Sequence, residues 1–125
     1  MCYDVVVVPP SSRDALGEFE QSLLLAIVHV GDDAYGVTIR REIEDRTGRD
    51  VAIGALYTAL DRLERKGFVT STMSEPTAER GGRSKRHYRL RPAGATALRR
   101  ARERMAQMWA GLTPSLMPLI KKDRS

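Results

Sequence analysis

The stretch from Ile53 to Tyr88 decides the fold and reads IGALYTALDRLERKGFVTSTMSEPTAERGGRSKRHY. Its first part predicts a helix from about Ile53 to Lys66, and the first two turns of that helix carry no charge. Its second part predicts two strands, about Phe68 to Met73 and Lys85 to Leu90, around a loop that contains glycine and proline. An uncharged helix followed by an arginine-rich hairpin is the order of elements with which a winged helix binds duplex DNA.

The positive charge is concentrated in one part of the chain. Between Arg80 and Arg104 there are ten Lys or Arg residues and one acid, Glu103, so this stretch has a net charge of +9. The remaining residues sum to −4, which leaves +5 for the 125-residue chain. Because neutralisation of phosphates supplies most of the sequence-independent affinity for nucleic acid, we expect double-stranded DNA, and not a membrane, as the acidic partner.

The rest of the composition excludes several classes of function. Hydrophobic residues make up 42% and charged residues 30% of the chain, as in one ordinary globular domain, and no run approaches the length of a membrane-spanning helix. A lone cysteine, Cys2, with two histidines gives no metal-ligand spacing. We find no paired carboxylates, nucleophile with a base, or phosphate loop. We therefore expect a cytoplasmic protein with no metal, cofactor or catalytic residue.

Two further helices are expected ahead of this stretch. Apolar residues recur at helical spacing from Leu16 to Val30 and predict the first of them. The second is expected from about Tyr35 to Thr47, with Asp32 and Asp33 ready to cap it. The side chains expected to be buried in this second helix are Val37, Ile39 and Ile43.

The helix that begins at Ile53 has two different sides. Ile53, Leu56, Leu60 and Leu63 form one apolar stripe, whereas the opposite side is small and uncharged at its start. A slim leading face allows a helix to approach base edges in the major groove. These small residues offer thymine-methyl contacts and one hydroxyl but no bidentate purine contact, so phosphate contacts and DNA shape should carry much of the selectivity. The residues expected at the DNA from this segment are Ala52, Gly54, Ala55, Tyr57, Thr58 and Arg62.

The hairpin should separate core from charge. In its second strand Tyr88 and Leu90 alternate with His87, Arg89 and Arg91, so the pleat places the two sets on opposite faces. Basic residues near the tip can follow the DNA backbone or enter a minor groove. The residues expected at the DNA from the hairpin are Arg80, Arg83, Lys85 and Arg86.

A fourth helix from Pro92 carries apolar residues at seven-residue spacing. Since the preceding elements already make a complete core, this face is expected to pack on the same helix of a second subunit. Such a homodimer would read an inverted-repeat operator. Pro114 and Pro118 predict a break after Leu112. The residues expected in the dimer interface are Leu98, Ala101, Met105, Met108, Trp109 and Leu112.

Three motifs resemble the PadR family of transcriptional regulators. They are LGEFEQSLLLAI from Leu16, GDDAYGVTIRREIEDRTGRDVAIGALYTALDRLERKGFVTS from Gly31, and GGRSKRHYRLRPAG, which ends at Gly94. The resemblance covers roughly Leu16 to Leu112 and implies a dimeric winged-helix repressor of the smaller subfamily. By the same resemblance, Gly54, Ala55, Tyr57 and Thr58 match the family's recognition helix, and Arg83, Lys85 and Arg86 match its wing. Arg91 departs from the family's usual threonine or serine before Pro-x-Gly, which puts the N-cap of the fourth helix in doubt.

The expected fold is mainly α with a small β-hairpin. It comprises an arm at 1–14, either a short strand or disordered, a winged helix-turn-helix DNA-binding domain at 15–91, a long dimerisation helix at 92–120 and a basic tail at 121–125. The expected function is a repressor that a small molecule or a stress signal releases from its operator. The alternative is a winged helix that binds protein or RNA without operator specificity.

Two residues keep alternative uses. Tyr57 either meets a phosphate or packs on a neighbouring helix. Trp109 either fills the dimer interface or stacks on a small hydrophobic or aromatic effector, as a tryptophan on this helix does in multidrug-binding relatives.

Overall fold

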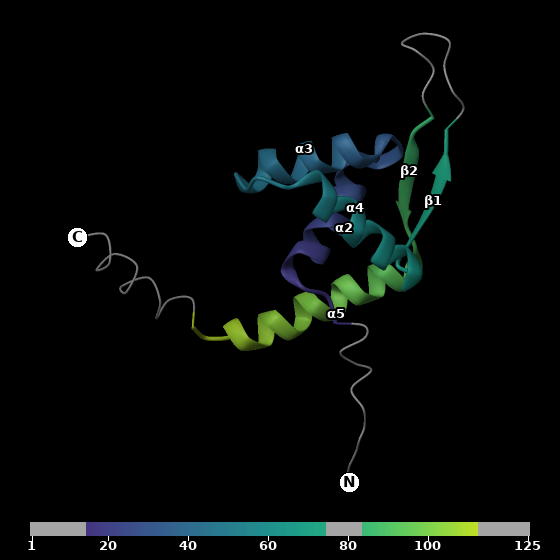
Figure 1. Cartoon of the computed structure of the whole chain (residues 1–125). Helices are drawn as coiled ribbons and strands as arrows, with labels where there is room; N and C mark the ends of the chain where they lie inside the picture. The colour runs from purple at the N-terminus through teal and green to yellow at the C-terminus, as the bar shows by residue number, and fades with distance from the viewer. Residues whose placement is uncertain (1–14, 75–83, 113–125) are drawn as a thin grey trace, which may run out of the picture.

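The computed structural model describes residues 15–74 and 84–112. The expected arm at 1–14, the hairpin tip with Arg80 and Arg83, and the chain beyond Leu112 lie outside the described residues. The described chain is mainly helical, with one antiparallel hairpin at its side (Figure 1), as the sequence predicted. Its elements are α2 (Glu18–Val30), η1 (Gly31–Asp33), α3 (Gly36–Thr47), α4 (Ile53–Arg65), β1 (Val69–Met73), β2 (Arg86–Leu90) and α5 (Pro92–Trp109).

The core is built around α2, which contacts α3, α4, β2 and α5. Leucines dominate it because both α2 and α4 turn a continuous apolar stripe inward. The largest fully buried side chains are Leu23, Leu24, Ile39, Leu56, Leu60, Leu63 and Val69. The apolar stripe predicted for α4 is confirmed at Leu56, Leu60 and Leu63, which are all buried. Their packing in the core fixes the position of α4.

Two residues expected in the core are exposed. Val37 is 46% exposed because it lies about 140° around α3 from the mean direction of Ile39 and Ile43, at about 100° per residue. Ile53 is 41% exposed because it is the first residue of α4 and extends beyond the packed part of the stripe. Both expectations of burial were wrong, since helical spacing alone does not say where a neighbouring element ends.

The start of α3 also differs from the expectation. Its N-cap is Tyr35, whose backbone N–H donates to Thr38 Oγ1 at 3.0 Å, and not Asp32 or Asp33. The Thr38 hydroxyl in turn donates to the Asp33 backbone carbonyl at 2.5 Å. The two aspartates instead form the short turn η1, which leaves their carboxylates available to the hairpin.

The hairpin is joined to the helices at two points. Strands β1 and β2 pair antiparallel, with Val69 opposite Leu90 and Thr72 opposite His87. The Tyr88 N–H of β2 donates to the Ala34 carbonyl at 2.8 Å, and Tyr35 forms an isolated bridge with His87. The segment Ala34–Tyr35, between α2 and α3, therefore pairs with the free edge of β2. This pairing holds the hairpin against the helices.

Helix α5 begins where the hairpin ends. The Arg91 N–H donates to the Phe68 carbonyl at 2.9 Å. A methyl group at Gly94 would overlap that same carbonyl oxygen and lie 2.7 Å from Leu90 Cδ1, so only glycine fits here. Arg91 occupies the N-cap position without a side-chain cap, as its departure from the family pattern predicted. The helix ends at Trp109, before the expected break after Leu112.

Candidate nucleic-acid interface

The outward face of α4 is slim over its first two turns. All six residues predicted at the DNA from this segment are exposed: Ala52, Gly54, Ala55, Tyr57, Thr58 and Arg62. Ala52 provides no side-chain cap, so the first backbone N–H groups of α4 remain open to an outside acceptor. The positive end of a helix favours an anion, and a DNA phosphate can be accepted there.

Tyr57 packs on the first residue of α3. A methyl group at Gly36 would lie 2.5 Å from Tyr57 Cζ and closer still to the hydroxyl oxygen, so the ring occupies the space beside that glycine. The tyrosine nevertheless keeps 42% of its surface exposed. Packing on a neighbouring helix, one of the two uses considered for this ring, is therefore observed, and it sets the spacing between α4 and the start of α3.

The turn ahead of α4 is held by Glu44. Its carboxylate accepts a hydrogen bond from the Val51 backbone N–H at 3.0 Å and pairs with Arg40 at 3.3 Å. The hydrogen bond from Val51 lowers the pKa of Glu44; desolvation opposes this, and the hydrogen bond and charge of Arg40 lower the pKa further. Gly48, at a φ of 71°, ends α3 in the left-handed conformation. Glu44 thus ties the turn of the helix-turn-helix to α3.

The described basic residues of the hairpin have partners within the molecule. Lys85 Nζ lies 4.3 Å from the centroid of the Tyr35 ring and 3.3 Å from its hydroxyl. Arg86 Nη1 lies 4.0 Å from Glu64 Oε1, and the other oxygen of Glu64 accepts from the Ser71 hydroxyl at 2.7 Å. Both cations stay exposed, so each is held at the base of the hairpin with its charge still open to a phosphate.

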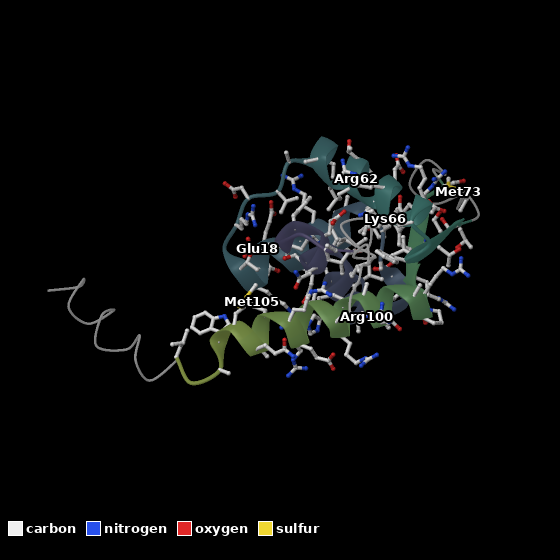
Figure 2. The ribbon with its side chains drawn as sticks, turned by 90° about the horizontal axis from the view of Figure 1, so that it is seen from below. Glu18, Arg62, Lys66, Met73, Arg100 and Met105 are labelled. Carbon is white, nitrogen blue, oxygen red and sulfur yellow. The ribbon has the colours of Figure 1, made fainter. Side chains whose placement is uncertain are left out.

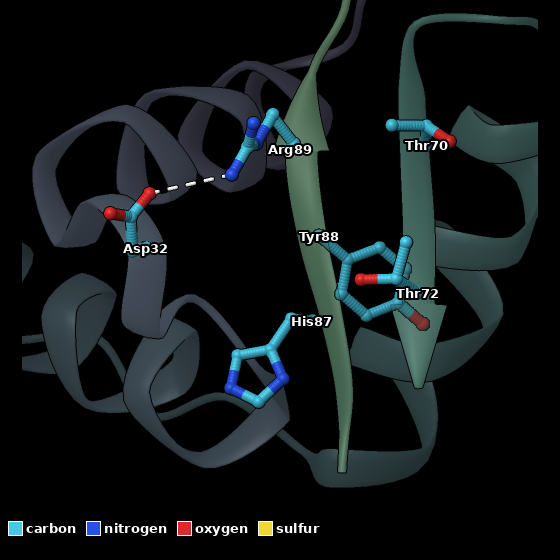
Figure 3. A pocket seen from close by; sticks show the side chains of 6 residues that line it. All are labelled: Asp32, Thr70, Thr72, His87, Tyr88 and Arg89. Atoms are coloured by element: carbon cyan, nitrogen blue, oxygen red, sulfur yellow. Dashed lines mark hydrogen bonds and ion pairs between the residues drawn. The ribbon is translucent and has the colours of Figure 1, made fainter. Parts of the chain in front are cut away.

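The other face of the hairpin is occupied by the turn η1. A hollow of about 240 Å³ lies on this face, and Figure 3 shows the side chains that line it. Arg89 pairs with Asp32 at 3.5 Å and His87 lies 3.7 Å from Asp33, so each basic group faces a carboxylate. The hollow is lined by Asp32, Thr70, Thr72, His87, Tyr88 and Arg89. The predicted separation of Tyr88 from His87 and Arg89 is confirmed, and the charged side is used to fasten the hairpin.

The basic residues of α4 and α5 do not all lie on one side of the molecule. Figure 2 shows Arg62 of α4 and Arg100 of α5 on opposite sides of the molecule. Arg100 therefore does not extend the α4 surface. Arg99 pairs with Glu103 at 3.4 Å within α5, so the charge of this arginine is partly compensated within its own helix.

The second half of α5 exposes large apolar side chains. Met108 is 72% and Trp109 48% exposed, and Met105 and Leu112 are also exposed. Leu98 and Ala101, by contrast, face the subunit's own core: Ala101 is buried and Leu98 packs against the core cluster. Of the six residues predicted in a dimer interface, these two are already covered and four remain open.

Three residues of this region were not among those that the sequence analysis predicted at the DNA. Asp61 and Arg65 are exposed on α4 between and beyond the predicted contacts, and Glu44 supports the turn that precedes them. Only the helical phase, fixed by the burial of Leu60 and Leu63, shows that Asp61 and Arg65 share the outward face. Over residues 15–74 and 84–112 we find no group of side chains suited to a metal ion. None of the helices in these ranges is both long and apolar enough to cross a bilayer.

The chain is similar to known transcriptional regulators in sequence. Residues 24–100 match the family model described as the transcriptional regulator PadR-like family. The transcriptional regulator Rv3488 of Mycobacterium tuberculosis is 35% identical over 96 residues, which are 72% of this chain and 85% of that protein.

Solved structures show the same fold. A transcriptional regulator from Clostridium thermocellum superposes with a TM-score of 0.62 at 25% identity, covering 72% of this chain and 84% of that one. A PadR family regulator from Clostridium difficile superposes with a TM-score of 0.58 at 24% identity, covering 82% and 98% of the two chains. The winged-helix arrangement expected from the sequence is confirmed by these structures.

Proposed function

Because this chain belongs to the PadR-like family of transcriptional regulators, we propose that it is a homodimeric repressor that occludes a promoter by binding an inverted-repeat operator. Membership of the family makes the chain a DNA-binding transcriptional regulator and not an enzyme. One observation above all supports the proposal: the start of α4, with Gly54, Ala55 and Thr58, is exposed and uncharged, and the end of the same helix contacts the basic hairpin, where Arg86 lies 4.0 Å from Glu64. Such a surface fits one major groove and its flanking phosphates.

In this proposal α4 and the hairpin contact different parts of the DNA. The N-terminal end of α4 enters the major groove, and its open N–H groups meet a phosphate. Further along the helix, Thr58 faces base edges and Arg62 meets another phosphate. Lys85 and Arg86, together with Arg80 and Arg83, contact the backbone beside that groove. Since no side chain among Gly54, Ala55 and Thr58 can clamp a purine, phosphate contacts and DNA shape contribute much of the selectivity.

The proposed dimer forms through the second half of α5. Met105, Met108 and Trp109 are exposed apolar side chains of α5, which extends past the core (Figure 1), and Leu112 is exposed just beyond the end of the helix. A second copy related by a two-fold axis would cover it and place two α4 helices toward one duplex. A small hydrophobic or aromatic effector that stacks on Trp109 would release the operator by changing the angle between the two subunits. We place the protein in the cytoplasm, where it meets DNA.

The experiment that tests the operator is selection of bound duplexes from a random pool at near-physiological salt. Enrichment of one inverted repeat, with half-sites about one helical turn apart, is the expected result. Salt-sensitive binding with no enriched sequence would contradict the repressor and favour a winged helix that contacts nucleic acid or protein without specificity.

The contribution of the hairpin is tested by salt dependence. Replacing Arg83 and Arg86 together with glutamine should reduce the slope of log affinity against log salt by roughly two, about one for each lost phosphate contact. The matched control replaces Arg100 and Arg104 of α5, which removes the same charge from a different helix. An unchanged slope in the first variant, or an equal change in the control, would show that the hairpin does not neutralise phosphates.

The dimer is tested by Leu112→Asp, which places a carboxylate in the proposed apolar interface. The variant should sediment as a monomer and bind the operator poorly, because a single half-site loses the second set of contacts. Glu103→Gln, within α5, is the control and should stay dimeric. A Leu112→Asp protein that remains a dimer in solution would refute this interface.

A further inference from the structure

Asp61 is the one acidic residue on the exposed face of α4. The other exposed residues from Gly54 onward on this helix are uncharged or basic. Glu64 is different, because its two oxygens are engaged by Ser71 and Arg86. Among residues 15–74 and 84–112, the hydrogen bonds and ion pairs of the second half of α4 involve Glu64 and not Asp61. A carboxylate without a partner among these residues, on a surface otherwise suited to DNA, lowers affinity for any phosphate nearby.

The position of Asp61 places it beside the side chains that would read bases. It follows Thr58 by three residues and precedes Arg65 by four, so it lies on the same outward side of α4 as both. With Glu64 and Arg65 it lines a shallow hollow of about 380 Å³. Glu64, which lines this hollow with Asp61, is engaged by Ser71 and Arg86 of the hairpin, so the hollow lies on the hairpin side of α4.

The chemistry of a carboxylate restricts what it can contact in a major groove. An ionised carboxylate only accepts hydrogen bonds, and so do phosphate oxygens, guanine O6 and N7, and thymine O4. The donors on that side of the bases are the amino groups of cytosine and adenine, and carboxylates pair with cytosine N4. A carboxylate in this place therefore rewards cytosine and penalises guanine or thymine.

We propose that Asp61 is a specificity-determining residue that accepts a hydrogen bond from the N4 amino group of a cytosine in each half-site. The proposal rests on the proposed function, because it assigns base reading within the same DNA surface. It supplies a direct base contact from the third turn of α4, beyond the small residues of the first two turns, and it explains why a negative charge is tolerated among Thr58, Arg62 and Arg65.

The test compares the sequences selected by the wild-type protein, Asp61→Asn, Asp61→Glu and Asp45→Asn. The wild type should enrich an inverted repeat with a cytosine at one symmetric position, and replacing that cytosine should weaken binding about 5- to 150-fold. Asp61→Asn, which keeps the shape but donates as well as accepts, should lose this preference at that position alone. Asp61→Glu should keep it. Asp45→Asn removes the same charge from an exposed site on α3 and should select the wild-type motif.

Failure of the inference and failure of the proposed function give different results. If Asp61→Asn selects the wild-type motif and binds every probe more tightly by the same factor, Asp61 only repels phosphates and the base contact is refuted. If the wild type and Asp45→Asn both enrich no motif, the operator-binding function itself fails and the cytosine contact fails with it. Thermal melting of each variant confirms that the fold is intact.

Discussion

The close approach of Tyr57 to Gly36 makes a strong prediction about stability. Gly36→Ala adds a methyl group 2.5 Å from Tyr57 Cζ, well inside the normal separation of about 3.5–4.0 Å between carbon atoms. Overpacking of this kind costs about 1–3 kcal/mol. The alanine would otherwise gain up to about 1 kcal/mol over glycine in a helix. In the wild-type background the substitution should therefore be neutral to destabilising by about 2 kcal/mol.

The sign should change when the ring is removed. In a Tyr57→Ala background the overlap is absent and Gly36→Ala should stabilise by up to about 1 kcal/mol. The coupling between the two sites is then about 1–3 kcal/mol, well above the error of a double-mutant cycle. Urea unfolding of the four proteins, followed by circular dichroism at one fixed concentration because a dimer's stability depends on it, measures this coupling.

A matched substitution controls for general effects of alanine. Gly17→Ala places a methyl group at the N-cap of α2, where no atom lies within 4 Å, so its effect should be the same with and without Tyr57. A cycle for Gly36 and Tyr57 that is additive to within about 0.5 kcal/mol would refute the packing of the ring on α3. The same variants report on function, because a displaced ring would change how α4 is presented.

Three further predictions concern the elements that position α4 and α5. Arg91→Thr should stabilise the protein by about 0.5–2 kcal/mol relative to Arg91→Ala, because threonine supplies the missing N-cap of α5; equal urea midpoints for the two variants would contradict this. Because the pKa of Glu44 is lowered by folding, its ionised form stabilises the protein above its ordinary pKa near 4.5 and that contribution is lost as the pH falls through the lowered value. Glu44→Gln should therefore flatten the loss of stability below about pH 4.5, and a parallel acid limb would refute the assignment. Gly94→Ala should destabilise by about 1–3 kcal/mol, since the added methyl overlaps the Phe68 carbonyl and a backbone atom cannot rotate away; an unchanged melting temperature would show that α5 can shift.

The order and type of the elements were predictable from the sequence. Helical periodicity predicted α2, α3 and α4, and alternation predicted β2, with bounds within two residues of the observed ones. These signals are local, because each depends on which face of one element is apolar. The missing cap at Arg91 was predictable for the same reason, since it depends on one side chain at one helix end. The small, exposed start of α4 could also be read directly from its residues.

Only the tertiary structure decided which partner each charged side chain meets and which of them stay exposed. Arg86 meets Glu64, Lys85 meets Tyr35 and Arg89 meets Asp32, and each of these contacts joins elements that are far apart in the sequence. Arg100, within the basic stretch, lies on the opposite side of the molecule from Arg62 of α4 (Figure 2). Sequence spacing fixes the direction of a side chain relative to its own helix, whereas pairing and burial depend on how the helices pack. The sequence by itself therefore determined a winged helix with a basic hairpin, and packing around α2 determined which groups remain open to DNA.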